Sequence, residues 1–319
     1  MSLRLAVTLG DPRGIGPEIV QAVLRNPPPG ADFVVVGPDE LVAGYAAGIG
    51  VGSLAGGSEQ GAGSRSTDSS TSSPLPAPGS LLAEAAGRLT GLAVEKAVEL
   101  TLAGKVDAIV TAPAQKSALH LAGYQYPGHT EWLAALAGDV DVAMMLAAEM
   151  LRVVLVTTHV PLSQVPQLLT TERVVRTGEI ASRALREWFG ISEPRLALCA
   201  VNPHAGEGGL FGDEDDTVLA PAAQQLGADG PLPADTVFVR ALRGEFDVVL
   251  APYHDVGMTA IKMAAFGSAV NVTLGLPFIR TSPDHGTALD IAGKGLADPS
   301  SMRKAVELAI ELANRRRAE

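Results

Sequence analysis

Short apolar runs alternate with stretches of helical spacing along this chain. Residues 3–9, 32–37 and 106–111 are apolar runs of the length typical of buried strands, and residues 81–104 repeat apolar side chains at helical spacing. A glycine at position 104 closes that stretch, as glycine commonly does at a helix C-terminus. Strands that alternate with helices predict an α/β fold with a largely parallel sheet.

The second half of the chain continues this alternation. Residues 141–157 hold two apolar runs that predict a hairpin, and residues 171–189 predict a long amphipathic helix. A strand over residues 269–274 and a C-terminal helix over residues 299–317 complete the pattern. Residues 46–80 are rich in glycine, serine, alanine and proline, and they predict a surface loop or insertion without catalytic content.

Three of the apolar runs deliver a histidine just past their last apolar residue; these are His159, His204 and His254. Open α/β sheets bind ligands at the carboxyl ends of their strands. Three imidazoles with an open position describe a catalytic divalent metal site. A single histidine of this kind is more often a helix cap or a satisfied polar residue, whereas three in the same context favour metal binding.

Polar side chains near these histidines add to the predicted site. Asp255 places a carboxylate directly after the last of them. Lys262 and Arg280 are expected in loops that leave apolar strands, where they suit phosphate or carboxylate binding, with surface salt bridges as the plainer alternative. His129 and Thr130 begin a predicted helix, so they form either an anion pocket or a capping turn.

Composition narrows the class of protein. With 319 residues, of which 47% are hydrophobic, the chain can bury a large core, and no apolar stretch approaches the length of a membrane span. The N-terminus lacks the pattern of a signal peptide, which predicts a cytoplasmic protein. The net charge of −11 argues against nucleic-acid binding, and the single cysteine, Cys199, excludes cysteine-based zinc motifs.

The loop after the first predicted strand contains glycines but does not complete a dinucleotide fingerprint. Gly14 and Gly16 are in place, but Ile19 stands where the third glycine would fall. Pro17 and Glu18 instead suit the first turn of a helix. A Rossmann cofactor site is therefore not favoured.

Seven motifs span nearly the whole chain: GDPRGIGPE at 10–18, GHTE at 128–131, TTH at 157–159, NPHAGE at 202–207, GPLPADT at 230–236, YHD at 253–255 and NVTLGLPFIRTS at 271–282. Together they resemble the 4-hydroxythreonine-4-phosphate dehydrogenase family of pyridoxal phosphate (vitamin B6) biosynthesis. The resemblance implies that the three strand-exit histidines bind the metal. It also implies the following substrate-binding residues: His129, Thr130, Lys262, Asn271 and Arg280.

The last loop is similar to that of isopropylmalate and isocitrate dehydrogenases, whose fold this family shares. The fold implied is two α/β/α domains with a cleft between them. Residues 1–125 with 284–319 would form the cofactor-side domain, and residues 126–283 would bind metal and substrate and form the dimer. The loop would bind the cofactor through His285, Gly286, Thr287, Ala288 and Asp290. An acidic residue at position 290 suits an unphosphorylated ribose, so NAD is expected rather than NADP.

The activity implied is NAD-linked oxidation of 4-phosphooxy-L-threonine, followed by decarboxylation of the β-keto acid. One divalent metal per subunit (zinc, magnesium or cobalt) would act as a Lewis acid, and Lys262 or Asp255 would serve as the base. A dehydrogenase of threonate or erythronate 4-phosphate is the alternative within the class. A metal-dependent lyase or hydrolase and a phosphate acyltransferase are alternatives from other classes, and a non-catalytic binding protein has no need of three convergent ligands.

Two further expectations follow from the resemblance. Arg13 and residues 256–260 depart from the usual family pattern near the substrate pocket, which bears on the choice of substrate more than on the chemistry. The family also implies a twofold homodimer in which metal ligands come from both subunits. We expect His159 and His204 from one chain and His254 from the other.

Overall fold

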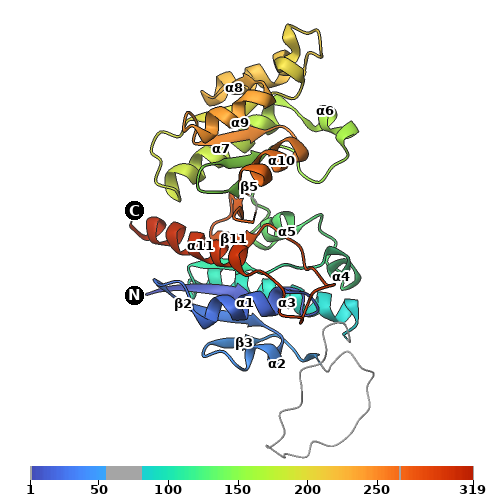
Figure 1. Cartoon of the computed structure of the whole chain (residues 1–319), viewed down its shortest axis with the longest axis vertical. Helices are drawn as coiled ribbons and strands as arrows, with labels where there is room; N and C mark the ends of the chain where they lie inside the picture. The colour runs from blue at the N-terminus through green and yellow to red at the C-terminus, as the bar shows by residue number, and fades with distance from the viewer. Residues whose placement is uncertain (1, 55–80, 266, 319) are drawn as a thin grey trace, which may run out of the picture. The chain divides into compact units, whose positions relative to one another are not determined.

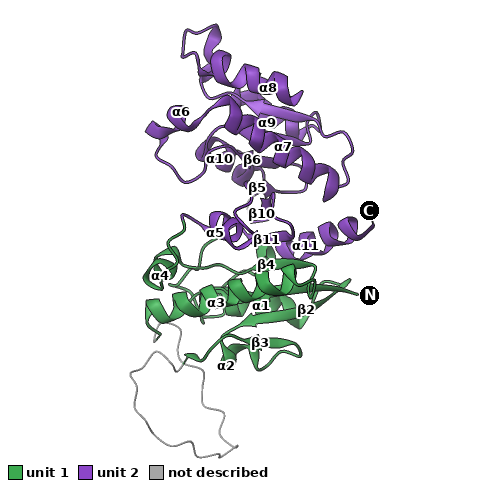
Figure 2. Ribbon diagram, turned by 180° about the vertical axis from the view of Figure 1, so that it is seen from behind, with its two compact units in different colours: residues 1–126, 285–302 green, residues 127–284, 303–319 purple. Residues whose placement is uncertain are grey.

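The computed structural model describes residues 2–54, 81–265 and 267–318 and divides the chain into two compact units (Figure 2). Unit 1 contains residues 1–126 and 285–302, and unit 2 contains residues 127–284 and 303–319. Both units are mixed α/β structures, as the alternating pattern predicts.

Unit 1 is built on four parallel strands in the order β3-β2-β1-β4. Their bounds are β1 (Leu3–Thr8), β2 (Ala31–Gly37), β3 (Gly48–Gly50) and β4 (Ala108–Thr111). The helices are α1 (Gly16–Arg25), α2 (Asp39–Val42), α3 (Ala83–Leu102) and α4 (Lys116–Leu121). Helix α3 packs on β1, β2 and β4, and the side chains of the central strands are almost all apolar and buried.

Unit 2 contains seven strands in the order β11-β10-β5-β6-β9-β7-β8. Their bounds are β5 (Ala143–Ala147), β6 (Arg152–Leu155), β7 (Leu196–Cys199), β8 (Asp229–Leu232), β9 (Val248–Ala251), β10 (Val270–Leu274) and β11 (Ile279–Pro283). The pairs from β11 to β6 are antiparallel, and the pairs from β6 to β8 are parallel. The two apolar runs in residues 141–157 therefore form the predicted hairpin, β5 with β6.

Helices α7 to α10 gather around these strands in Figure 1. The helices of this part of the chain are α5 (His129–Leu136), α6 (Val165–Leu168), α7 (Thr171–Glu187), α8 (Ala220–Leu226), α9 (Ala234–Leu242), α10 (His254–Ala264) and α11 (Ser300–Ala318). Three short turns are η2 (Leu162–Gln164), η3 (Pro203–Glu207) and the π-helical η4 (Asp215–Leu219). Strand and helix patterns thus predict most elements, with α7 and α11 within a few residues of their expected bounds.

The structure corrects the expected setting of two cations. Lys262 lies on helix α10 and Arg280 lies within strand β11, whereas the sequence pattern predicts loops for both. Arg280 is only 2% exposed; its strand pairs with β10, and its guanidinium contacts Thr273 on β10 and His129 at the start of α5. A single charged residue inside a short apolar strand has no distinctive sequence signal, since strand ends and strand interiors look alike at this length.

The C-terminal helix also differs from the expected division of domains. Residues 303–319 belong with unit 2, whereas residues 284–319 are all expected in the cofactor-side domain. The reason is local bonding within unit 2: the hydroxyl of Thr281 donates to the Ala305 carbonyl at 2.8 Å, and Arg315 donates to the Phe189 carbonyl at 2.7 Å. The expected insertion at residues 46–80 lies outside the described residues from residue 55 onward.

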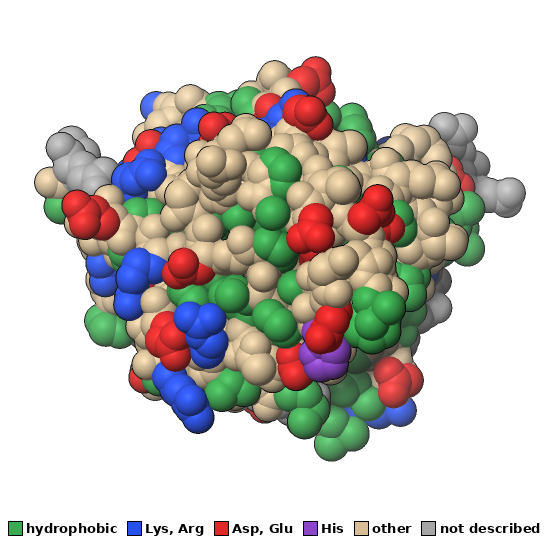
Figure 3. Space-filling model, turned by 90° about the horizontal axis from the view of Figure 1, so that it is seen from above, with side chains coloured by type: hydrophobic (Ala, Val, Ile, Leu, Met, Phe, Trp, Pro, Cys, Tyr) green, Lys and Arg blue, Asp and Glu red, His purple; other side chains and the backbone are tan. Residues whose placement is uncertain are grey.

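The exposed surface carries both acidic and basic side chains (Figure 3). One face, shown in Figure 3, carries acidic side chains spread among apolar ones, with basic side chains gathered toward one side. Among the residues that the structure describes, no helix combines the length and the apolar character needed to cross a membrane.

Candidate active site

The three strand-exit histidines follow three neighbouring parallel strands of unit 2. His159 comes after β6, His254 opens helix α10 after β9, and His204 lies in η3 after β7. Strand β9 pairs with β6 on one side and with β7 on the other. The carboxyl ends of the three strands therefore lie at one edge of the sheet, where ligands bind in open α/β folds.

His159 and His254 lie side by side at this edge. Their ring centroids are 5.5 Å apart, with 47° between the ring planes. His254 Nδ1 is 2.7 Å from the carboxylate of Asp255, so in the neutral ring Nδ1–H donates and Nε2 keeps its lone pair. A cavity of about 130 Å³ adjoins the pair, and its lining residues are Thr158, His159, Val160, Leu162, Val165, Tyr253, His254 and Asp255.

His204 does not join this pair. Its ring lies instead beside Phe211, at 6.4 Å between centroids. Within the residues described, no three side chains of histidine, cysteine, aspartate or glutamate are grouped closely enough to hold a metal. The loop after β7 does not follow the course of the segments after β6 and β9. Its start is held by the buried carboxylate of Asp215, which accepts hydrogen bonds from the amides of Val201 (2.9 Å) and Asn202 (3.0 Å). One chain thus supplies two adjacent imidazoles. Imidazole is a suitable ligand for a divalent ion, but a catalytic site of this kind needs a third protein ligand.

A second polar group, which we call the Arg280 cluster (His129, Asn271 and Arg280), lies within unit 2. Arg280 Nη1 donates to the Thr273 hydroxyl at 3.1 Å, and Nη2 lies 3.4 Å from His129 Nδ1. Asn271 and Thr273 are two residues apart on β10, so both side chains are on the same face of the sheet as Arg280. His129, Asn271 and Arg280, three predicted substrate residues from α5, β10 and β11, therefore lie in one part of unit 2.

Burial sets the protonation states in this cluster. Burial lowers the pKa of Arg280 to about 10, which still leaves the guanidinium charged near neutral pH. Burial, together with the charge of Arg280, lowers the pKa of His129 to about 3. The imidazole is therefore neutral; with Nδ1 facing the guanidinium, its proton is on Nε2. His129 keeps some exposed surface, but Nε2 itself is buried and has no hydrogen-bond partner.

Two acceptor atoms nearby are also buried without a hydrogen-bond partner: Asn271 Oδ1 and Glu131 Oε2. Buried polar atoms in native proteins are almost always paired, so unpaired atoms in one region indicate a place where a ligand binds. Glu131 is absent from the sequence-based prediction. Its position in the first turn of α5, in the same motif as His129 and Thr130, was the available signal.

The other two predicted substrate residues are Lys262, which lies beside an acidic side chain, and Thr130, which lies at a cavity. Lys262 Nζ lies 3.3 Å from Asp284 Oδ2, and the lysine side chain is 45% exposed. Asp284 is not among the predicted site residues, although it directly precedes the predicted cofactor loop. Thr130 lines a cavity of about 480 Å³ that Glu131 and Thr158 also line.

The predicted cofactor loop lies in unit 1, next to the glycine-containing loop after β1. The amide of Ile15 donates to the Thr287 carbonyl at 2.9 Å, and a Cβ on Gly14 would lie only 2.8 Å from that same oxygen. Glycine at position 14 thus permits the contact between the two loops. His285 Nδ1 is 3.1 Å from the Gly286 carbonyl, and Ala288 has a φ of +41°.

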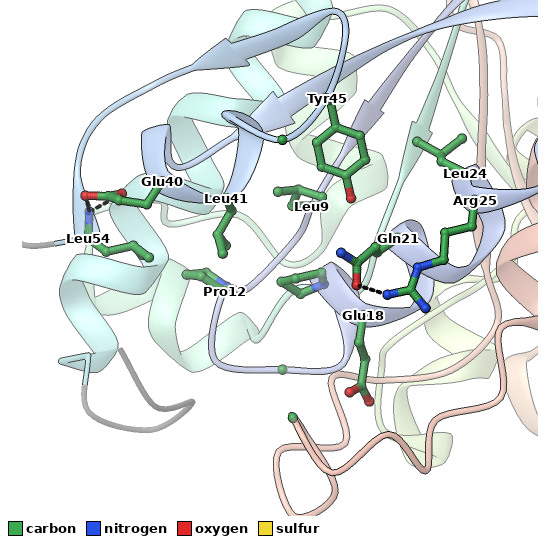
Figure 4. A pocket seen from close by; sticks show the side chains of 14 residues that line it. Leu9, Pro12, Glu18, Gln21, Leu24, Arg25, Glu40, Leu41, Tyr45 and Leu54 are labelled. Carbon is green, nitrogen blue, oxygen red and sulfur yellow. Dashed lines mark hydrogen bonds between the residues drawn. The ribbon is translucent and has the colours of Figure 1, made fainter. Parts of the chain in front are cut away.

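Unit 1 also contains a cavity of about 600 Å³ (Figure 4). Gly14 and Gly293 line it from the two loops, and Leu41, Tyr45 and Pro12 point toward it in the close-up. Arg13, one of the departures from the family pattern, is accounted for nearby: its guanidinium lies 2.8 Å from the fully buried carboxylate of Asp11.

Comparison with known proteins decides the family. Residues 39–309 match the family described as Pyridoxal phosphate biosynthetic protein PdxA. This chain belongs to the PdxA family.

Two relatives of nearly equal similarity carry different enzyme names. The 4-hydroxythreonine-4-phosphate dehydrogenase of Geobacter metallireducens is 46% identical, with 97% of this chain and 95% of the relative covered. The D-threonate 4-phosphate dehydrogenase of Salmonella typhimurium (strain LT2) is 45% identical, with 97% of this chain and 98% of the relative covered. Overall identity therefore does not separate these two substrates.

Solved structures agree with the family and the fold. The crystal structure of 4-hydroxythreonine-4-phosphate dehydrogenase from Klebsiella pneumoniae has a TM-score of 0.80 and 41% identity, covering 98% of this chain and all of that one (100%). The isocitrate dehydrogenase of Methylococcus capsulatus, at 16% identity and a TM-score of 0.50, shares only the fold, with 99% of this chain and 87% of that one covered. The expected isocitrate dehydrogenase-like fold is confirmed.

Proposed function

We propose that this PdxA-family dehydrogenase oxidises the C3 hydroxyl of 4-phosphooxy-L-threonine in pyridoxine 5′-phosphate biosynthesis. The first product is 2-amino-3-oxo-4-phosphooxybutanoate, a β-keto acid that loses carbon dioxide to give 3-amino-2-oxopropyl phosphate. The observation that carries the proposal is the Arg280 cluster, which combines a buried cation with an unpaired donor and an unpaired acceptor.

Each member of the Arg280 cluster matches a group of this substrate. Arg280 binds an anionic end, phosphate or carboxylate, through its planar guanidinium. His129 donates from Nε2 to a substrate oxygen and stays neutral, so its hydrogen bond has a fixed direction. Asn271 Oδ1 accepts from a donor, which in this substrate is the amino group. Thr130 adds a hydroxyl at the neighbouring cavity.

We assign the metal to His159, His204 and His254. Asp255 holds the tautomer of His254 with Nε2 available, as carboxylates do for many metal-binding histidines. A bound divalent ion (zinc, magnesium or cobalt) would supply Lewis-acid chemistry that makes the substrate hydroxyl more acidic.

Proton removal is assigned to Lys262 in preference to Asp255. The Asp255 carboxylate already accepts a hydrogen bond from His254, which favours an orienting role. Lys262 Nζ lies 3.3 Å from Asp284 Oδ2, a contact that holds the end of its side chain in place, and its neutral amine would be the group that takes up the proton.

The cofactor assigned is NAD, held by the loop of unit 1 that contains His285, Gly286, Thr287, Ala288 and Asp290. The contact between Thr287 and the Gly14–Ile15 backbone supports this assignment, because it fixes the loop at the carboxyl end of β1. NAD supplies the hydride acceptor. Asp290 accepts from ribose hydroxyls and repels a 2′-phosphate, which favours NAD over NADP.

The assembly proposed is a homodimer with shared sites. His159 and His254 are adjacent in one chain, and His204 is not. This geometry favours a division different from the one expected from the sequence: His159 and His254 belong to one chain, and His204 comes from the second. Twofold symmetry then completes two identical sites.

The test is reduction of NAD by the purified protein with added divalent metal, comparing 4-phosphooxy-L-threonine with D-threonate 4-phosphate. We expect the higher kcat/KM with the amino-bearing substrate. The second candidate function, oxidation of threonate 4-phosphate, is supported by the Salmonella relative, because Asn271 Oδ1 can also accept from a hydroxyl. A higher kcat/KM with threonate 4-phosphate would reverse the assignment.

A further inference from the structure

The loop after β1, which runs from Leu9 to Glu18 in Figure 4, is built around one buried carboxylate. Asp11 has no exposed surface. Its Oδ1 accepts a hydrogen bond from the backbone amide of Arg13 at 3.0 Å, which closes a tight turn that we call the Asp11 turn (residues 11–14). A carboxylate in the interior is costly unless charged or polar partners bind it. The stability of the Asp11 turn therefore depends on the partners of this carboxylate.

Arg13 supplies the charged partner. Its guanidinium donates from Nε to Asp11 Oδ1 at 3.0 Å and from Nη2 to Asp11 Oδ2 at 2.8 Å. A planar guanidinium that binds both oxygens of a carboxylate makes a strong contact with a fixed direction. The Arg13 side chain is only 11% exposed, so water and salt screen this pair less than the exposed ion pairs of the surface.

Arg13 also joins two loops. Its Nη2 donates to Oε1 of Gln115, which lies in the loop after β4. Strands β1 and β4 are parallel neighbours, so both loops leave the sheet at the same edge of unit 1. The amide of Asp11 donates to the Pro113 carbonyl at 3.0 Å, which is a second link between the same two loops. The Asp11 turn is therefore held from two directions.

The Asp11 turn supports the proposed cofactor loop. The amide of Gly14 donates to the Asp11 carbonyl at 3.0 Å, and the amide of the next residue, Ile15, donates to the Thr287 carbonyl at 2.9 Å. A Cβ on Gly14 would lie 2.8 Å from that same oxygen, so the two backbones are in close contact. A shift of the Asp11 turn would therefore break the bond from Ile15 or displace Thr287.

We propose that Arg13 is a positioning residue for the cofactor, because it holds the Asp11 turn in the shape that supports residues 285–290. This inference rests on the proposed function, which assigns NAD to those residues. Arg13 acts through Asp11, Ile15 and Thr287 and needs no contact with NAD. A loop that is already formed loses less conformational entropy when the cofactor binds. Since Arg13 departs from the usual family pattern, this support is a feature of this chain.

Hydrogen exchange tests the support without any cofactor. The Ile15 amide is the probe, because its hydrogen bond joins the two loops. In Arg13→Ala it should exchange roughly tenfold faster than in wild type, measured by mass spectrometry with fragmentation to single residues. Arg13→Lys should give an intermediate rate, because an ammonium cannot bind both Asp11 oxygens and Gln115 together. Exchange at the wild-type rate in Arg13→Ala would overturn the proposal.

Cofactor binding is the second measurement. NADH is titrated into the protein without substrate and followed by fluorescence. The Kd should rise roughly tenfold in Arg13→Ala, because the loop must then be ordered when the cofactor binds, and by less in Arg13→Lys. Arg88→Ala is the control, since it removes the same charge from an exposed position on α3 of unit 1. An equal rise in both alanine variants would show a general charge effect and exclude positioning.

A destabilised variant separates positioning from a loss of stability. Val94→Ala removes buried side-chain volume from α3 and should lower the Tm, but it leaves the Asp11 turn intact. Measured well below both Tm values, its Kd for NADH should equal that of wild type. In steady-state kinetics Arg13→Ala should raise KM for NAD with kcat close to wild type. A Kd that rises as much in Val94→Ala as in Arg13→Ala would assign Arg13 to stability alone.

The two proposals fail in different ways. If wild type does not bind NADH, the cofactor assignment is wrong, and so is the positioning role that rests on it. If wild type binds NADH and Arg13→Ala binds it equally tightly, the cofactor assignment stands and the positioning role is wrong.

Discussion

The Arg280 cluster and the three strand-exit histidines both lie in unit 2, but they differ in the structures that hold them. Arg280 and Asn271 are within strands, and His129 begins a helix, so the packing of the core fixes all three. The histidines follow strands, and the paths of the next turns decide where their rings lie. His254 continues into α10 beside His159, whereas the loop after β7 carries His204 to Phe211. A strand-exit position thus predicts the edge of the sheet, but not the direction of the side chain.

The largest expected effect comes from removing the histidine that stands apart. His204→Ala should lower kcat/KM by about 1000-fold or more and reduce zinc retention, because one of the three proposed metal ligands is lost. Its thermal unfolding should match wild type, since β7 and the buried Asp215 contacts are unchanged. Metal analysis and calorimetry of the purified variant measure both; a wild-type metal content would exclude His204 as a ligand.

Mixed refolding of inactive variants sharpens the division of ligands between chains. If His159 and His254 share a chain, His159→Ala refolded with His204→Ala gives hybrid dimers with one intact site. Random pairing then restores about a quarter of wild-type activity. His159→Ala with His254→Ala should stay inactive. The opposite pattern would support the division expected from sequence, with His159 and His204 on one chain.

A smaller effect on catalysis is expected when Arg280 is replaced by lysine, which keeps the positive charge but not the planar shape of the guanidinium. Arg280→Lys should raise KM for 4-phosphooxy-L-threonine roughly ten- to a hundredfold, because a planar fork is replaced by a point charge that cannot reach Thr273 and the substrate together. Steady-state kinetics measure it, and Arg240→Lys, at an exposed ion pair on α9, is the control. An unchanged KM would assign Arg280 to structure alone.

These contrasts explain what the sequence can and cannot predict here. Apolar runs predict β6, β7 and β9, and the ends of these runs locate the histidines that follow the strands. Arg280 is predicted as a binding residue but not as a buried strand residue, because burial depends on neighbours distant in the sequence. Glu131 and Asp284 are missed, since neither has its own pattern, and only the folded chain shows the buried oxygen of Glu131 and the ion pair of Asp284 with Lys262.

The cofactor loop of unit 1 offers a smaller effect. Asp290→Ser removes a negative charge from the proposed ribose site, so kcat/KM for NADP relative to NAD should rise by about tenfold. The ratio is measured with both cofactors at fixed substrate. If wild type already uses NADP as well as NAD, Asp290 does not contact the ribose.

The smallest expected effect is a change in how stability depends on pH, and it belongs to the buried cluster alone. The folded protein holds the His129 pKa near 3, because burial and the charge of Arg280 oppose protonation, whereas an unfolded histidine has a pKa of about 6.5. Between these values the unfolded chain binds a proton that the folded chain does not. The contribution of the neutral His129 to the free energy of unfolding is therefore fully present above about pH 6.5 and declines as pH falls toward 3.

Urea unfolding at pH 6.5 and pH 5 should show that the free energy of unfolding of wild type falls by about 1.5 kcal/mol more than that of His129→Gln over this interval. His120→Gln, which removes an exposed imidazole of unit 1 and keeps His129, is the control and should retain the wild-type slope. Equal slopes for wild type and His129→Gln would mean that His129 is not held neutral by burial, and its role as a fixed Nε2–H donor to the substrate would have to be abandoned.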